Sequence, residues 1–169
     1  MFKNIVLVVL LLSLSVMCLP EIAHAADETI YELSEHLSSK FPSIEAIKEK
    51  FGDEAKWQEE TMPSPHDPNL TLHINHMNNP GMEIRTMGYS LEDGDRLLIL
   101  LLDAKKAGFV DFLGVDIGSS KEDVIKKFGS PQIIEGNELH YQDENEFCLV
   151  TFTVVNNKVA GMRFNSYPD

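Results

Sequence analysis

One ten-residue segment occurs twice in the chain, and this internal repeat constrains the fold more than any other feature. Residues 43–52 read SIEAIKEKFG and residues 120–129 read SKEDVIKKFG, with five identities in ten at an offset of 77 residues. Each copy predicts a short helix, because a serine precedes it as a cap and a glycine ends it. Two such units fill the chain once an N-terminal leader is set aside. We expect Phe51 and Phe128 to be equivalent core anchors.

Turn sequences divide the rest of each unit into strands. The turns are rich in Asn, Asp, Gly and Pro, as at 78–81 and 156–157, and connections this short make neighbouring strands antiparallel. The expected strands are 55–61, 70–77, 82–90 and 96–103 in the first unit, and 132–135, 138–142, 146–155 and 158–164 in the second. The first unit has an additional amphipathic helix at 28–40, with Ile30, Leu33, Leu37 and Phe41 on one stripe.

These elements predict an α+β fold made of two tandem repeats. In each repeat, a short helix or helices pack on a four-stranded antiparallel meander sheet. The first repeat spans residues 26–103 and the second spans residues 104–169. The run 97–102 is apolar on both faces of its strand, which predicts a central strand covered on both sides.

Residues 1–25 have the features of a secretory signal peptide. They comprise a weakly basic start, an apolar run from 5 to 19, and small residues at 23 and 25. The apolar run is shorter than the ~20 residues that span a bilayer. A lipid on Cys18 is the alternative, but Met17 stands where lipoprotein signals have a small residue. We expect cleavage after Ala25, no membrane anchor, and a periplasmic or secreted protein.

The net charge limits the kinds of partner that we expect, and the cysteine content shows whether a disulfide can stabilise the fold. The chain has 14 Lys and Arg against 27 Asp and Glu, a net charge of −13. An acidic surface repels phosphates, so we expect no nucleic-acid partner and favour a partner with a basic or neutral surface. After cleavage Cys148 is the only cysteine, which excludes an internal disulfide. Its apolar surroundings, 147–150, predict a buried and unreactive thiol.

The second copy of the repeat resembles a known family. This segment resembles the repeat unit of the β-lactamase-inhibitor-protein-like (BLIP-like) superfamily. The matching residues are Gly114-Val115-Asp116-Ile117-Gly118-Ser119-Ser120-Lys121-Glu122-Asp123-Val124, followed by Phe128-Gly129-Ser130-Pro131. Lipoproteins of the SmpA/OmlA type, from the outer-membrane assembly machinery, carry a similar single unit. Residues 80–84 look like the start of a strand in secreted members. The resemblance implies helices on one face of an antiparallel sheet and an open face that binds protein. The disulfides of the secreted inhibitors and the lipidated cysteine of the lipoproteins are not matched here.

Strand alternation separates the side chains of three expected strands into an apolar set and a mixed set. We expect the apolar sets to meet the helices and the mixed sets to line the open face. The apolar sets are Leu70, Leu72 and Ile74, then Met82 and Ile84, then Cys148, Val150, Phe152 and Val154. Interface cores favour aromatic, Met and Arg side chains. The predicted binding residues are therefore His73, Arg85, Met87, Tyr89, Phe147 and Leu149, and the alternative is an ordinary solvated sheet face.

Catalytic patterns are weak in this sequence. It has no glycine-rich phosphate loop and no Gly-x-Ser-x-Gly elbow. His73 and His76 are three apart on an expected strand and therefore point to opposite faces, so they would not both bind a metal from regular strand geometry. A bulge or loop could instead bring His66, Asp67 and His73 together as ligands. We therefore expect a non-enzymatic protein-binding module, inhibitor-like or an envelope assembly accessory, with no cofactor or metal. A metal-dependent hydrolase at these three residues and a small-ligand carrier are the alternatives.

Overall fold

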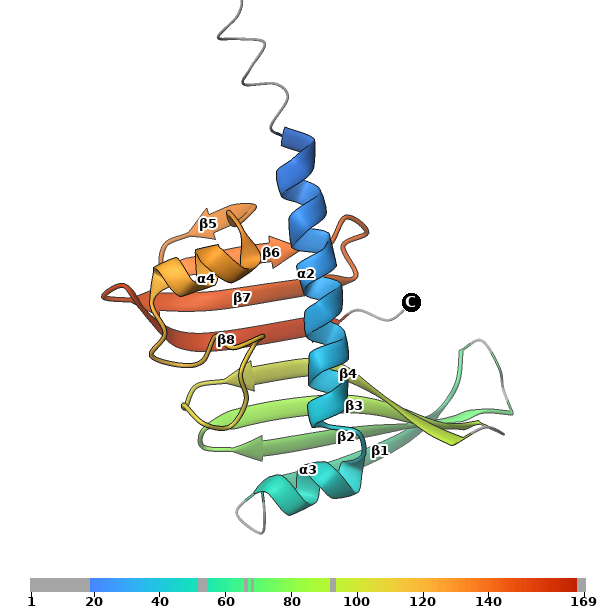
Figure 1. Cartoon of the computed structure of the whole chain (residues 1–169). Helices are drawn as coiled ribbons and strands as arrows, with labels where there is room; N and C mark the ends of the chain where they lie inside the picture. The colour runs from blue at the N-terminus through green and yellow to red at the C-terminus, as the bar shows by residue number, and fades with distance from the viewer. Residues whose placement is uncertain (1–18, 52–54, 66, 68, 92–93, 167–169) are drawn as a thin grey trace, which may run out of the picture.

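Eight strands join into one antiparallel sheet, in the order β1-β2-β3-β4-β8-β7-β6-β5 (Figure 1). The computed structural model describes residues 19–51, 55–65, 67, 69–91 and 94–166. The strands are β1 (Lys56–Pro63), β2 (Thr71–Asn79), β3 (Met82–Leu91), β4 (Gly94–Ala104), β5 (Ile133–Glu135), β6 (Glu138–Gln142), β7 (Cys148–Val155) and β8 (Lys158–Ser166). The helices within this part of the chain are α2 (Leu19–Lys40), α3 (Ile44–Phe51) and α4 (Lys121–Phe128).

The predicted arrangement of two repeats, each with a four-stranded sheet, is wrong because β4 pairs with β8. The pairing runs from Leu101 opposite Asn165 to Ala104 opposite Met162. In two separate sheets, β4 and β8 would each leave a row of unpaired backbone N–H and C=O groups at an edge. Pairing these two edges satisfies both rows. The strands of residues 26–103 and of residues 104–169 therefore belong to a single sheet.

Helix α2 holds the two halves of the sheet together from one side. It crosses the strands (Figure 1) and packs against β4, β6 and helix α4. Ile30, Leu33 and Leu37 are spaced three and four residues apart, which places them on one helix face. Each is at most 2% exposed. One helix thus contributes to a core that both halves share.

Helix α2 begins earlier than the amphipathic pattern predicts. It runs without a break from Leu19 to Lys40, so the expected cleavage point after Ala25 lies within it. The expected signal peptide also includes residues 1–18, which lie outside the described residues, and its cleavage stays a prediction. None of the described helices combines the length and apolar character needed to cross a membrane.

Serine caps set the starts of the two short helices. The Ser43 hydroxyl accepts a hydrogen bond from the Ala46 N–H before α3, at 3.2 Å. Ser120 accepts from the Asp123 N–H before α4, at 3.1 Å. The Asp123 carboxylate accepts in turn from the Ser120 N–H, at 2.8 Å, which completes a capping box.

The last turns of these helices carry the two phenylalanines of the repeat. Phe51 is 6% exposed and Phe128 is 1% exposed. After α4, Gly129 has a φ of 78°, a left-handed conformation that only glycine adopts without a Cβ penalty. Its carbonyl oxygen accepts a hydrogen bond from the Tyr141 hydroxyl, at 3.2 Å. This contact ties the helix end to strand β6.

The core lies between the sheet and the helices. Cross-strand partners form one row of side chains over seven strands on this side of the sheet. The row consists of Trp57, Met77, Ile84, Leu102, Phe164, Val150 and Tyr141. Apart from the half-buried Trp57, every member is at most 1% exposed.

The facing predicted from strand alternation is correct for β3 and β7 and reversed for β2. Met82 and Ile84 of β3 are in the core, as are Val150 and Phe152 of β7. In β2, however, Met77 is fully buried in the core. Alternation divides a strand into two sets but does not say which set meets the helices, and β2 has apolar residues in both. Residues 73, 75 and 77 face the helix side, and residues 72, 74 and 76 face away.

Candidate functional site

An aliphatic strip crosses the face of the sheet opposite the helices. The three described helices all lie on one side of the sheet (Figure 1), and we call the other side the helix-free face. The aliphatic strip is defined here as Leu72, Ile74, Met87, Leu98, Leu101 and Leu149. These residues come from strands β2, β3, β4 and β7.

Strand register builds the strip. Ile74 of β2 lies opposite Met87 of β3, which lies opposite Leu98 of β4. Leu101 and Leu149 both lie opposite Asn165 of β8, one from each side. Partners in adjacent strands project to the same face, so Ile74, Met87 and Leu98 are neighbours, and Leu149 lies on the same face beyond Asn165.

A β-bulge brings two leucines of β4 onto the same face. Leu98 and Leu101 are three residues apart, and in a regular strand they would point to opposite faces. The register shifts between Arg85 and Thr86, so that Arg85 lies opposite Leu101 while Thr86 lies opposite Ile99. Leu100 is the extra residue that the bulge inserts into β4. The run 97–102 is therefore apolar on both faces of a central strand, as predicted, but the described helices cover only one of them.

The strip is apolar surface outside the main core. Leu72 is only 8% exposed, yet it is not a member of the hydrophobic core on the helix side. The other five strip residues are half-buried. Met62 of β1, on the same face as Leu72 and directly opposite it, is 46% exposed. Part of the helix-free face is thus aliphatic, with Asn165 of β8 standing between Leu101 and Leu149.

A polar band runs beside the strip on the same face, and its charges are paired with one another. Asp103 of β4 has a side chain only 10% exposed and contacts Arg163 Nη2 at 2.8 Å and Lys105 Nζ at 3.6 Å. The hydrogen bond to Asp103 raises the pKa of Arg163. His76 Nε2 lies 2.9 Å from the Glu83 carboxylate.

A further pair extends the polar band toward β6. His140 Nε2 is 3.6 Å from Glu138, and its Nδ1 is 3.1 Å from the Thr151 hydroxyl. The permanently charged groups Asp103 and Arg163 are thus paired with each other inside the band. The aliphatic strip, by contrast, gains free energy from any apolar surface that covers it.

Three of the six predicted binding residues lie on the same face of the sheet. Arg85, Met87 and Leu149 lie on the helix-free face, the latter two in the aliphatic strip. His73 faces the helix side instead, where its Nδ1 is 3.1 Å from the carboxylate of Glu59. This facing follows from the reversed orientation of β2.

The remaining two predicted residues lie at the margins of the described site. Phe147 precedes β7 and is 43% exposed. Tyr89 belongs to β3 by its backbone, opposite Arg96, but its side chain lies outside the described part of the structure. Sequence reasoning missed Leu72, Ile74, Leu98 and Leu101. The apolar run 97–102 was the available indication of the last two.

The three residues of the metal-site alternative have different surroundings. His66 lies outside the described residues. The Asp67 carboxylate accepts a hydrogen bond from the Asn69 N–H at 2.9 Å, and His73 pairs with Glu59. Within the described residues, no group of three or more His, Cys, Asp or Glu side chains is placed to hold a metal ion.

Cys148 is a half-buried thiol at the start of β7. Burial raises its pKa most, and the nearby charge of Asp143 raises it further, while a hydrogen bond with Ser166 acts in the opposite direction. A raised pKa keeps the thiol protonated and so a weak nucleophile near neutral pH. This environment agrees with the packing role predicted for Cys148.

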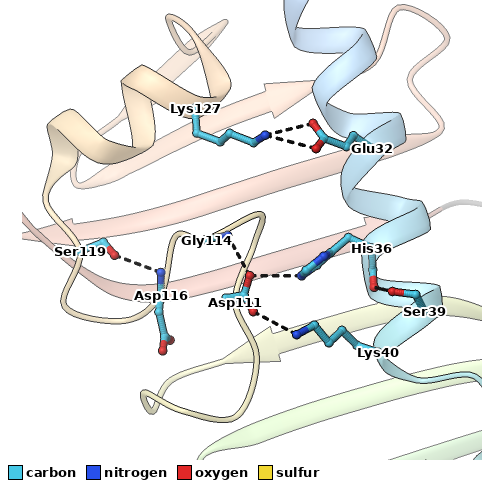
Figure 2. A network of polar contacts seen from close by, with 9 residues as sticks. All are labelled: Glu32, His36, Ser39, Lys40, Asp111, Gly114, Asp116, Ser119 and Lys127. Atoms are coloured by element: carbon cyan, nitrogen blue, oxygen red, sulfur yellow. Dashed lines mark hydrogen bonds and ion pairs between the residues drawn. The ribbon is translucent and has the colours of Figure 1, made fainter.

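A second polar network fixes helix α2 to the loop between β4 and α4 (Figure 2). The Asp111 carboxylate contacts His36 Nε2 at 3.2 Å and Lys40 Nζ at 3.6 Å, and it accepts from the Gly114 N–H at 2.8 Å. Burial alone would raise the pKa of Asp111. The Gly114 hydrogen bond and the charges of His36 and Lys40 outweigh this effect and lower the pKa.

The same helix is also tied to α4. Lys127 Nζ lies 3.1 Å from a carboxylate oxygen of Glu32 (Figure 2). Together with the Asp111 contacts, this pair fastens α2 to the segment that joins the two halves of the chain. These contacts act on the helix side and leave the helix-free face unobstructed.

Comparisons with protein families, with curated proteins and with solved structures find no match to this chain. The assignment of a function therefore depends on the geometry of the described residues.

Proposed function

We propose that the chain is an exported protein-binding module that holds its partner on the helix-free face of the sheet. It acts by binding, as an inhibitor-like protein or an envelope assembly accessory, and not by catalysis. The partner is an exported or envelope protein whose overall surface is neutral or basic, because this chain has a net charge of −13. The resemblance to BLIP-like proteins supports this proposal.

The observation that carries the proposal is the aliphatic strip. Soluble proteins rarely leave a continuous apolar surface without a use, and such patches commonly mark protein interfaces. The strip lies on a sheet, whose backbone hydrogen bonds hold its side chains in fixed positions. It is bordered by a band of paired charges, which matches the usual interface pattern of an apolar centre and a polar rim.

A comparative capture experiment tests the proposal. The exported protein is used as bait in three forms: the parent, a Met87→Thr/Leu98→Thr double variant, and a Tyr31→Thr control. Threonine retains strand propensity while removing apolar surface from the strip. Tyr31 is 67% exposed on helix α2 and lies on the opposite side of the sheet from the strip.

We expect one partner to be captured by the parent and the control and to bind the double variant at least ~30-fold more weakly, as for loss of a hot spot worth ~2 kcal/mol. Circular dichroism spectra of the three forms serve as the control that each is folded. A partner that binds all three forms equally would show that the strip is not the site. Stoichiometric metal in the purified protein, with hydrolytic activity that a chelator removes, would favour the hydrolase alternative instead.

A further inference from the structure

Arg85 stands next to the aliphatic strip on the helix-free face. It projects from β3 between its cross-strand partners His76 of β2 and Leu101 of β4. Met87 lies two residues further along the same strand and therefore on the same face. The Arg85 side chain is exposed, whereas Leu101 and Met87 beside it are half-buried. Arg85 thus has two aliphatic neighbours, Met87 and Leu101, on one side and two polar neighbours, His76 and Glu83, on the other.

Arg85 has no counter-ion among the described residues. The two nearest carboxylates on its face have other partners: Glu83 contacts His76 at 2.9 Å, and Asp103 contacts Arg163 at 2.8 Å. No ion pair or hydrogen bond joins the Arg85 guanidinium to any described side chain. Neither carboxylate forms an ion pair with Arg85, so its guanidinium group has free hydrogen-bond donors on this face.

A partner that covers the strip also removes water from Arg85. An arginine keeps its charge at every relevant pH, and burial of that charge without an acceptor opposes binding. A carboxylate satisfies the guanidinium with two parallel hydrogen bonds, which a single carbonyl oxygen does not provide. Covering the strip therefore favours a partner that brings a carboxylate to this position.

We propose that the partner presents an aspartate or glutamate, flanked by aliphatic or aromatic side chains, and that this carboxylate pairs with Arg85. This inference rests on the proposed function, because it assumes that the partner covers the strip. The net charge of −13 favours a partner that is neutral or basic overall, and one carboxylate that pairs locally with Arg85 is compatible with such a partner. The partner has one acidic side chain at the centre of an otherwise neutral or basic surface.

Selection from a library of random displayed peptides tests this inference without knowledge of the natural partner. The baits are the parent, Arg85→Glu, Arg85→Lys and the Met87→Thr/Leu98→Thr variant. We expect the parent to enrich peptides with Asp or Glu beside Leu, Ile or Phe. Arg85→Glu should enrich peptides with Lys or Arg at that position, because the charge it presents is reversed.

Affinities of one enriched peptide and its Glu→Gln or Asp→Asn analogue complete the test. The analogue should bind the parent about tenfold more weakly or worse, as expected for loss of a charge-assisted hydrogen bond. Arg85→Lys should bind the acidic peptide more weakly than the parent, because lysine does not offer the bidentate geometry.

The possible failures are distinguishable. Peptides that lose affinity for the Met87→Thr/Leu98→Thr variant, but have no acidic residue and bind Arg85→Glu normally, would overturn the inference and leave the proposed function standing. Peptides that bind the double variant as well as the parent would contradict the proposed function, and the inference with it. A library that enriches no peptide on the parent would also count against both.

Discussion

Replacement of Phe128 by alanine is the strongest test of the packing. The ring is 1% exposed, and its centroid lies 4.9 Å from that of Phe152 and 5.5 Å from that of Tyr141. Phe→Ala in such a core costs about 3–5 kcal/mol, since apolar burial is lost and a cavity remains. Because Phe128 ends α4, the variant also loosens the contact of that helix with the sheet.

The expected loss is large enough for a simple melting experiment. For a chain of this size, 1 kcal/mol changes Tm by about 2–4 °C, so Phe128→Ala should lower Tm by roughly 6–20 °C. Thermal melts followed by circular dichroism measure this change, and urea titration gives the free energy of unfolding. Phe147→Ala is the matched control, because Phe147 is 43% exposed and should change stability by only ~0.5 kcal/mol.

The same reasoning applies to Phe51, its counterpart in the repeat. Phe51 is 6% exposed and its ring centroid is 5.6 Å from that of Phe109. Phe51→Ala should therefore also lower Tm by several degrees or more. If both variants melt within a few degrees of the parent, the two short helices do not anchor the core through these residues, and the packing argument is refuted.

Three further outcomes follow from the contacts and the sequence. Asp111→Asn should destabilise the protein at neutral pH, and urea titrations of parent and variant across pH should converge on acidification. The reason is that a carboxyl with a lowered pKa contributes stability above its unfolded pKa of about 3.9 and loses it as pH falls through the folded value. An equal difference at pH 7 and pH 2 would contradict that assignment. Cys148 should react with a thiol reagent at pH 8 more slowly in the folded protein than in urea, because burial raises its pKa and the side chain is half-buried; equal rates would show an accessible thiolate. The intact mass of the exported protein should correspond to a chain that starts at Ala26, and a mass that retains residues 1–25 or a lipid would refute this.

Local sequence patterns predicted the secondary structure well. Ser43 and Ser120 cap their helices as the sequence indicates, and the Asn-rich turns separate strands close to the expected bounds. These features depend on residues within a few positions of one another. The hydrogen bonds of caps and tight turns form inside that range, so the sequence alone specifies them.

The residues of the helix-free face were only partly predictable for the same reason. Arg85, Met87 and Leu149 were placed correctly by alternation, since a side-chain period of two holds along one strand. His73 was misplaced, because alternation gives the two faces of β2 but not which one meets the helices. The joint placement of Leu98 and Leu101 depends on the bulge opposite Arg85 and Thr86, which no local pattern indicates.

By itself the sequence determined the elements of this protein: two short capped helices, a longer amphipathic helix and eight strands joined by short turns. Only the tertiary structure decided that β4 pairs with β8 to make one sheet, and that α2 crosses both halves on one side. Both are contacts between segments far apart in the chain. Their free energy comes from closing two exposed strand edges and from sharing one core. Neither contribution can be recognised in the sequence of any single segment. The same arrangement puts the described helices on one face of the sheet and the aliphatic strip on the other.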